Sequence, residues 1–454
     1  MMCSYFTSCG GKRGVGKFLI AVCIAAFCFS YSARAVTVQK VTSPGGLEAW
    51  LVEDYSIPVI SVKFGFQGGA LTDLKGKGGR AAMAAALLIE GGAGDVTGQD
   101  LQKRLASRAI RLSFEGQLED TVGLLKTTAE YRQQAFELLG LILAQPRFES
   151  EAVTRVQSQL ITSLKLSRER PRTLSQLRLS EALYGDHPYA RPIEGTVESV
   201  SSLNAGDMAA FMDAGISRDR LTIGVTGAVS PDELGILLDQ AFGVLPESSR
   251  VDAPRVAAEI SVRFDGQVKH VEIDVPQSSV VFADEGVGYR DPDFYAASVL
   301  NYVLGAGGFS SRLMDEIREK RGLVYGIKTW FVGLDQASTL AGGFATDEAR
   351  VEETIKLVRQ EWARMRQEGP TTAELEAAKK HMVGAWPLKF TSTDRIADFL
   401  YFLQEHDLPK DYFTKRNEHI QAVTMDDVRR VAARLLDADR LTFVVAGRLS
   451  KKQI

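Results

Sequence analysis

Apolar and β-branched residues alternate with polar ones early in the chain and predict two neighbouring strands, over residues 47–53 and 57–67. An alanine-rich and leucine-rich run, 80–90, ends at a Gly-Gly pair and has the composition of a helix. Apolar positions then recur with helical spacing at 101–109, 134–144, 148–166 and 207–212, whereas 110–118 and 220–227 alternate like strands. The pattern therefore mixes paired strands with helices.

A short motif divides the chain into two similar halves. Asp-Arg-Leu-Thr at 219–222 recurs at 439–442, which is 220 residues later (439 − 219), and a strand-like run follows both copies. Similar helical segments precede both copies, at 206–208 and 426–428. Aligned endings of two equal halves indicate a duplicated domain. Because strands come in adjacent pairs, we predict an α+β fold with two duplicated domains, each an antiparallel-rich sheet backed by helices.

The N-terminus has the layout of a secretory signal. Basic residues precede an apolar run, 18–30, and an Ala-Arg-Ala cleavage site follows at 33–35. We expect a signal peptide over 1–35 and a periplasmic mature protein; the alternatives are an uncleaved anchor and lipidation at Cys23, which the bulky Val22 disfavours. The mature chain would then divide into a domain over 36–245, a proline-containing linker over 246–258 and a domain over 259–454.

Composition narrows the classes of function. The net charge is −3 and the sequence pI is about 6.1, with no basic stripe, so neither nucleic acid nor an anionic membrane is an expected partner. All four cysteines precede the predicted cleavage site. The mature chain would therefore have no disulfide, no thiol nucleophile and no thiolate metal site.

Residues 305–330 carry the clearest candidate chemistry, in the order glycine loop, helix, stop and, from Leu323 onward, strand. Ser310 or Ser311 is placed to cap the helix, and Gly322 to end it in a left-handed conformation. Arg318 and Tyr325 meet only if the turn at Gly322 folds the strand back beside the last helical turn. Together they would offer a cation and a phenolic donor to a carbonyl oxygen that gains negative charge. The alternative is a solvated charged face beside an ordinary strand aromatic.

This stretch resembles the C-terminal half-site of the pitrilysin/insulinase family of zinc peptidases, which includes the mitochondrial processing peptidases and paired bacterial subunits. The resemblance implies two α+β domains per subunit and assigns transition-state and substrate binding to Arg318 and Tyr325. It also implies that the loop glycines, Gly307 and Gly308, let substrate backbone approach closely.

The other half-site of that family, H-x-x-E-H on a helix, is replaced in this chain. Aligned on Gly79 and the paired leucines at 87–88, the two histidines fall on Ala82 and Ala86 and the general base on Ala85. The distal glutamate ligand falls near Ser163. Alanine can neither bind a metal nor accept a proton, and none of the five histidines has the spacing of a helical ligand pair. We expect no metal and no cofactor in this chain.

The resemblance therefore implies a non-catalytic subunit of a heterodimeric periplasmic zinc peptidase, inactive alone. Its partner would be a paralogous subunit that bears H-x-x-E-H and zinc, and its ligand a peptide. The alternative is an inert peptide-binding, assembly or scaffold protein of the same fold.

Overall fold

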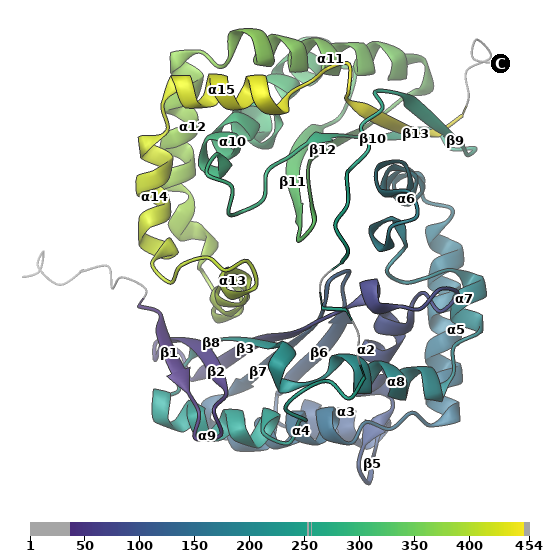
Figure 1. Cartoon of the computed structure of the whole chain (residues 1–454), viewed down its shortest axis with the longest axis vertical. Coiled ribbons are helices and arrows are strands. Elements are labelled where there is room, and N and C mark those ends of the chain that lie inside the picture. The colour runs from purple at the N-terminus through teal and green to yellow at the C-terminus, as the bar shows by residue number, and fades with distance from the viewer. Residues whose placement is uncertain (1–36, 252–253, 256, 449–454) are drawn as a thin grey trace, which may run out of the picture. The chain divides into compact units, whose positions relative to one another are not determined.

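The computed structural model describes residues 37–251, 254–255 and 257–448 (Figure 1). The predicted signal peptide lies outside these residues, as does part of the predicted linker, so the predicted domain boundaries stay predictions. Among the described helices, none combines the length and the apolar character that a membrane crossing requires. Two mixed β-sheets backed by helices form the described chain, which confirms the predicted fold class.

The first sheet has six strands in the order β1-β2-β8-β3-β7-β6. β2 and β8 run parallel, and the other neighbours run antiparallel. These strands are β1 Gln39–Thr42, β2 Glu48–Glu53, β3 Val59–Gln67, β6 Arg111–Gly116, β7 Asp120–Thr128 and β8 Leu221–Gly227. A small separate hairpin pairs β4 Gly92–Ala93 with β5 Val96–Thr97.

The second sheet has five strands and repeats the plan of the first. In the order β9-β13-β10-β12-β11, β9 and β13 are parallel and the rest antiparallel, as in β2-β8-β3-β7-β6. These strands are β9 Val268–Glu272, β10 Ser278–Glu285, β11 Ile327–Leu334, β12 Ala337–Thr346 and β13 Thr442–Gly447. The shared strand order agrees with the internal repeat predicted from the sequence.

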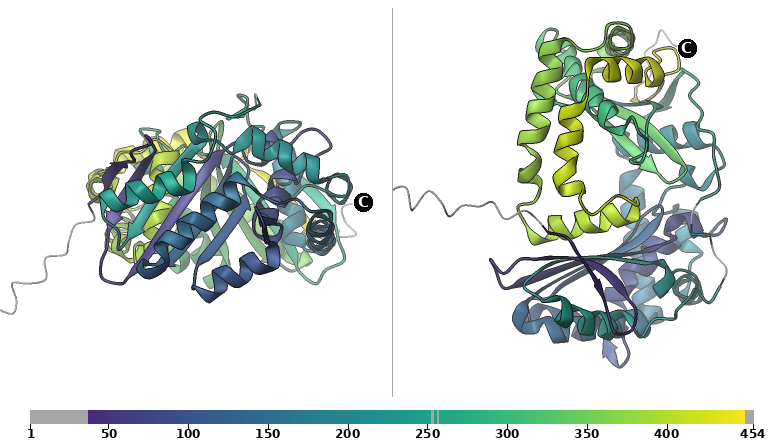
Figure 2. Two further views of the ribbon diagram at one scale, coloured as in Figure 1. Left: turned by 90° about the horizontal axis from the view of Figure 1, so that it is seen from below. Right: turned by 60° about the vertical axis from the view of Figure 1, so that its left-hand side comes forward.

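The repeated motif follows equivalent helices in the two halves. α8 Ala205–Gly215 and α15 Met425–Leu435 each begin with a capping box, formed by Asn204 and Thr424 respectively. The remaining helices are α2 Arg80–Glu90, α3 Gly98–Ser107, α4 Arg132–Ala144, α5 Ser150–Ser167, α6 Pro171–Tyr184, α7 Val197–Ser201, α9 Pro231–Phe242, α10 Phe294–Asn301, α11 Val351–Glu368, α12 Thr372–Gly384, α13 Thr393–Glu405 and α14 Tyr412–Ala422. Figure 2 shows the helices beside each sheet from two further directions.

Each sheet also receives one helix from the other half of the chain. α13 packs on β3 and β8 of the first sheet, and α6 packs on β10 and β13 of the second. Two glycines allow this close approach. A Cβ on Gly224 would lie 2.5 Å from the Ala397 carbonyl oxygen, and one on Gly65 would lie 2.3 Å from the Tyr401 hydroxyl. Gly224 therefore needs to be glycine, because it faces the backbone of α13, whereas at Gly65 an added Cβ would displace the Tyr401 side chain.

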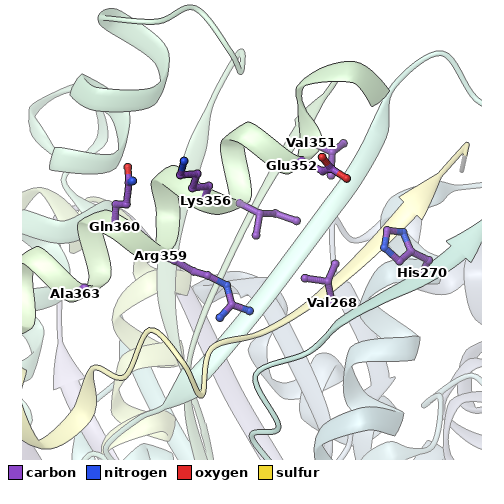
Figure 3. A pocket seen from close by; sticks show the side chains of 9 residues that line it. Val268, His270, Val351, Glu352, Lys356, Arg359, Gln360 and Ala363 are labelled. Atoms are coloured by element: carbon purple, nitrogen blue, oxygen red, sulfur yellow. The ribbon is translucent and has the colours of Figure 1, made fainter. Parts of the chain in front are cut away.

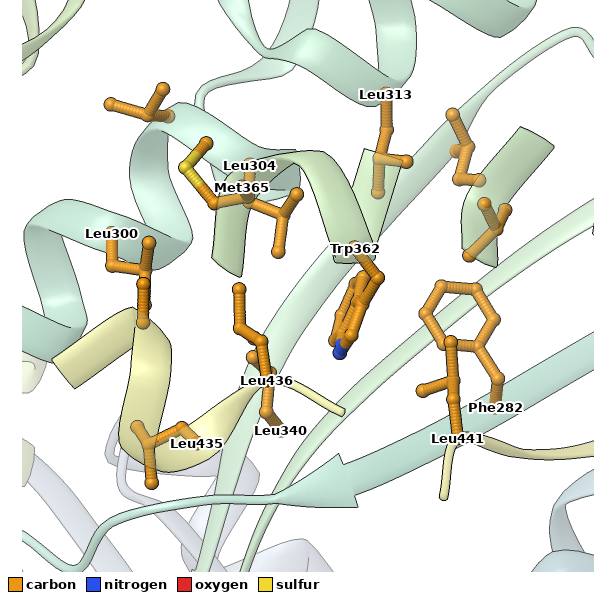
Figure 4. Packing of buried hydrophobic residues seen from close by; sticks show 14 of the residues in the cluster. Phe282, Leu300, Leu304, Leu313, Leu340, Trp362, Met365, Leu435, Leu436 and Leu441 are labelled. Atoms are coloured by element: carbon orange, nitrogen blue, oxygen red, sulfur yellow. The ribbon is translucent and has the colours of Figure 1, made fainter. Parts of the chain in front are cut away.

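The core of the second half forms around Trp362, whose side chain is fully buried among aliphatic residues of α10, α11 and α15 (Figure 4). Its indole N–H donates to Asp284 Oδ2 at 2.9 Å. Arg440, from the repeated motif, donates to the other oxygen of that carboxylate at 2.9 Å. The buried carboxylate is therefore paired and hydrogen-bonded, as a charge in a core must be.

A cluster of carboxyl groups joins the two halves beside α13. The Asp335 N–H donates to Glu119 Oε1 at 3.0 Å, and the Tyr189 hydroxyl donates to the same oxygen. Burial raises the pKa of Glu119 to about 7. Burial and a hydrogen bond with Asp120 raise the pKa of Glu405 well above its usual range, which favours the protonated form of this side chain.

Candidate active-site segment

Two π-helical turns flank the glycine loop. They cover Tyr302–Ala306 and Met314–Glu319, and between them lies a single 3-10 turn, Gly308–Ser310. Hydrogen bonds five residues apart define the π turns: the Gly307 N–H donates to the Tyr302 carbonyl at 2.9 Å, and the Lys320 N–H to the Asp315 carbonyl at 2.9 Å. Such turns are rare and occur often at functional sites.

The predicted serine caps are wrong. The Ser310 and Ser311 hydroxyls donate to the carbonyl oxygens of Gly307 and Gly308, at 2.8 and 2.7 Å, and so tighten the loop. Arg312 anchors the helix start, because its guanidinium is buried and holds both oxygens of Glu374 at 2.7 Å. Burial alone would raise the pKa of Glu374, but the bonds from Arg312 and Thr371 lower it to about 2.

The predicted helix stop is confirmed, whereas the predicted strand start is wrong. Gly322 has φ +63°, in the left-handed region, and the Leu323 N–H donates back to the Ile317 carbonyl at 3.1 Å. β11 begins only at Ile327. Tyr325 therefore lies on an irregular segment before the strand, and its side chain is 90% exposed.

The turn brings Arg318 and Tyr325 together. Arg318 Cζ lies 5.7 Å from the centre of the Tyr325 ring and 4.6 Å from the centre of the Phe309 ring. Phe309, which is 69% exposed, was not singled out by the sequence analysis, although an aromatic residue beside a glycine loop is a usable signal. The guanidinium also pairs with Glu319. The half-buried cation thus lies against two exposed rings, which orient it.

The two loop glycines differ in what they do. A Cβ on Gly307 would lie 2.6 Å from the Tyr302 carbonyl oxygen, so the loop itself requires glycine there. Gly308 has φ +60°, and an added Cβ would meet no atom within 4 Å. Gly308 therefore presents open backbone, and its predicted role in substrate binding stays a prediction.

A cavity of about 850 Å³ lies beside Tyr325 and Gly308. We call it the basic pocket, because Arg170, Arg172 and Lys328 line it. It is bounded by the start of α6 and by β10, β11 and β12, with an apolar floor that includes Met314, Trp330 and Phe344. Its size is that of a ligand site.

A second cavity, of about 580 Å³, lies between the edge strand β9 and α11 (Figure 3). Its most prominent cation, Arg359, donates to three backbone carbonyls, those of Gly266, Ala438 and Leu441. None of the residues predicted to form a site lines this cavity. We therefore place the candidate site at residues 305–325 and the basic pocket.

The helix that would carry the metal motif is well formed but chemically inert. Asp73 caps its start by accepting from the N–H groups of Gly79 and Arg80, at 2.9 and 3.1 Å. Burial raises the pKa of Asp73 to about 6. Of the positions aligned with the motif, Ala85 is 2% exposed, whereas Ala82 and Ala86 are half-buried on one face of the helix.

Ser163 lies on the neighbouring helix α5 and is exposed. The family's zinc does not fit the methyl groups and the hydroxyl at these four positions. Within residues 37–448, where they are described, no three His, Cys, Asp or Glu side chains gather closely enough to hold a metal ion.

Comparisons with known proteins agree with this geometry. Residues 202–382 match the model of the peptidase M16 inactive domain. A Helicobacter pylori protein named non-peptidase homolog YmxG is 24% identical over 96% of this chain and 99% of its own length. A mitochondrial-processing peptidase subunit beta of Lentinula edodes is 25% identical over 70% of each chain.

Comparison with solved structures also finds similarity to the M16 inactive domain. A crystal structure described as a peptidase M16 inactive domain, from Pseudomonas fluorescens, has a TM-score of 0.84 and 25% identity, and covers 91% of this chain and 98% of its own. Family model, relatives and fold coincide, and the resemblance noted from residues 305–325 is confirmed. Over nearly its whole length the chain is similar to proteins of the M16, insulinase-like, peptidase family, and residues 202–382 match the inactive domain of that family.

Proposed function

We propose that this chain is the zinc-free subunit of a heterodimeric periplasmic zinc peptidase. The observation that carries the proposal is the contrast between two regions. The half-buried Arg318 lies against the exposed Tyr325, which lines a large pocket, whereas the metal-binding positions of α2 hold only methyl groups. Zinc and the attacking water would belong to the partner, a paralogue that bears H-x-x-E-H.

The role of this chain is to bind the peptide and to stabilise charge on its scissile carbonyl. β11 is an edge strand of its sheet, so an extended peptide can pair with its outer side. Tyr325 would donate its hydroxyl to the carbonyl oxygen, and Arg318 would exchange Glu319 for the developing oxyanion. Donors placed where negative charge develops stabilise the transition state more than the ground state.

The family context supports a partner, and the N-terminal sequence supports the compartment. One relative is named as the beta subunit of a processing peptidase, which by its name works with another subunit. The basic and apolar leader in residues 1–35 supports a periplasmic location.

A second candidate function is an inert peptide-binding or scaffold protein. It is favoured by the relative that aligns over nearly its whole length and is named a non-peptidase homolog. In that case Arg318 and Tyr325 would be peptide contacts without a catalytic effect.

Substitutions in the reconstituted pair separate the two functions. We expect Tyr325→Phe and Arg318→Ala each to lower the turnover of a peptide by about tenfold or more, as loss of a transition-state donor does. Arg321→Ala is the matched control, since Arg321 lies near the same helix end but pairs with Glu316. Unchanged turnover in both variants, with normal subunit binding, would favour the scaffold.

A further inference from the structure

The basic pocket has an uncompensated positive charge. Three cationic side chains line it: Arg170 and Arg172 at the start of α6, and Lys328 on β11. No Asp or Glu is found among its lining residues. In the part of the chain that the structure describes, none of these three cations pairs with a carboxylate. The whole chain has a net charge of −3, so the local positive charge of the pocket is opposite in sign to the net charge of the protein.

The start of α6 adds to the positive electrostatic potential of the basic pocket. α6 has fourteen residues, begins with Pro171, and has no side-chain cap at its N-terminus. Its first backbone N–H groups therefore carry the positive end of the helix dipole beside the two arginines. The Ser175 hydroxyl lies 3.3 Å from that of Ser279 on β10, which fixes this end of the helix over the second sheet.

The floor of the pocket is apolar and aromatic. Lys328 Nζ lies 5.6 Å from the centre of the Trp330 ring, and both side chains belong to the same face of β11. A cation over an aromatic ring, beside an open apolar floor, suits a ligand that alternates an acidic with an aromatic or aliphatic side chain.

We propose that the basic pocket binds a segment of an extended peptide that carries Asp or Glu side chains next to an apolar residue. Pairing with the free edge of β11 places the peptide backbone beside Tyr325, and its carboxylates then lie toward Arg170, Arg172 and Lys328. This inference rests on the proposed function only in taking a peptide as the ligand. It adds the charge that the peptide must carry.

Binding to the isolated chain tests the inference without any turnover. The probes are three fluorescein-labelled twelve-residue peptides, amidated at the C-terminus, that contain Phe flanked by Glu, by Gln or by Lys. At low salt we expect the Glu peptide to bind at least about tenfold more tightly than the Gln peptide, and the Lys peptide most weakly. Amidation removes the terminal carboxylate as a source of charge.

The double variant R170Q/R172Q should lose most of that preference. Arg178→Gln is the matched control, because Arg178 lies on the same helix but pairs with Glu181 outside the pocket. Thermal unfolding of each variant checks that the helix remains in place. Equal affinity for the Glu and Gln peptides, or a preference that R170Q/R172Q leaves unchanged, would overturn the inference.

The two proposals fail separately. If the Glu peptide were preferred but Tyr325→Phe left turnover unchanged, the pocket assignment would stand and the catalytic role would be removed. If the Glu peptide were not preferred but Tyr325→Phe lowered turnover tenfold, the catalytic role would stand and the pocket assignment would be removed.

Discussion

Helix α2 and residues 305–325 correspond to the two half-sites that the family resemblance implies, and their side chains differ in the chemistry they offer. α2 keeps its cap, its length and its packing, but its functional positions now hold alanines. Residues 305–325 hold a half-buried Arg318 and an exposed Tyr325 over a buried anchor at Arg312. Chemistry can thus be lost from one region without loss of the fold, because functional side chains and packing side chains are different residues.

The largest expected effect removes the anchor of the second region. We expect Arg312→Ala to lower the free energy of unfolding by about 3 kcal/mol, because Glu374 is left partly buried without its cation. Lys320→Ala, which removes an exposed ion pair from the same helix end, should change the free energy of unfolding far less. Chemical denaturation measures both, and equal effects would contradict the role of Arg312 as an anchor.

The same pair predicts an acid dependence. The lowered pKa of Glu374 means that its contribution to stability is complete above pH 4.5 and is lost as the pH falls toward about 2. Arg312→Ala should remove most of this contribution, so the variant and the parent should converge in stability at low pH. Denaturation at several pH values measures the convergence.

The next effect concerns α2. Ala85→Glu should lower the free energy of unfolding by about 2 kcal/mol or more, since Ala85 is buried and a carboxylate there has no partner. Ala82→His, at a half-buried position on the same helix, should cost less than about 1 kcal/mol. If Ala85→Glu were neutral, α2 would still have room for the family's general base, and the contrast between the two regions would weaken.

The smallest effect lies where the two halves meet. The raised pKa of Glu405 means that the folded state holds a proton that the unfolded state releases above pH 4.5. Stability therefore falls as the pH rises above 4.5, and Glu405→Gln should be more stable than the parent at pH 8, by about 1 kcal/mol. The exposed Glu418→Gln is the control. A variant that is less stable than the parent at pH 8 would contradict this assignment.

Local patterns predicted the local features. Alanine and leucine content predicted α2 over residues 80–90, glycine predicted the helix end at 322, and the repeated tetrapeptide predicted equivalent strands β8 and β13. The exchange of α6 and α13 between the sheets was not predicted, because it depends on contacts between distant segments such as Gly224 and Ala397. The π turns and the place of Phe309 beside Arg318 were missed for the same reason: tertiary packing sets them.

The most direct test of a zinc-free subunit measures bound zinc and peptide hydrolysis on the purified mature chain, alone and mixed with an H-x-x-E-H paralogue. We predict no stoichiometric zinc in the isolated chain, and hydrolysis beyond that of the paralogue alone only in the mixture. One zinc per chain, together with hydrolysis by the isolated chain that a chelator abolishes, would contradict the proposal.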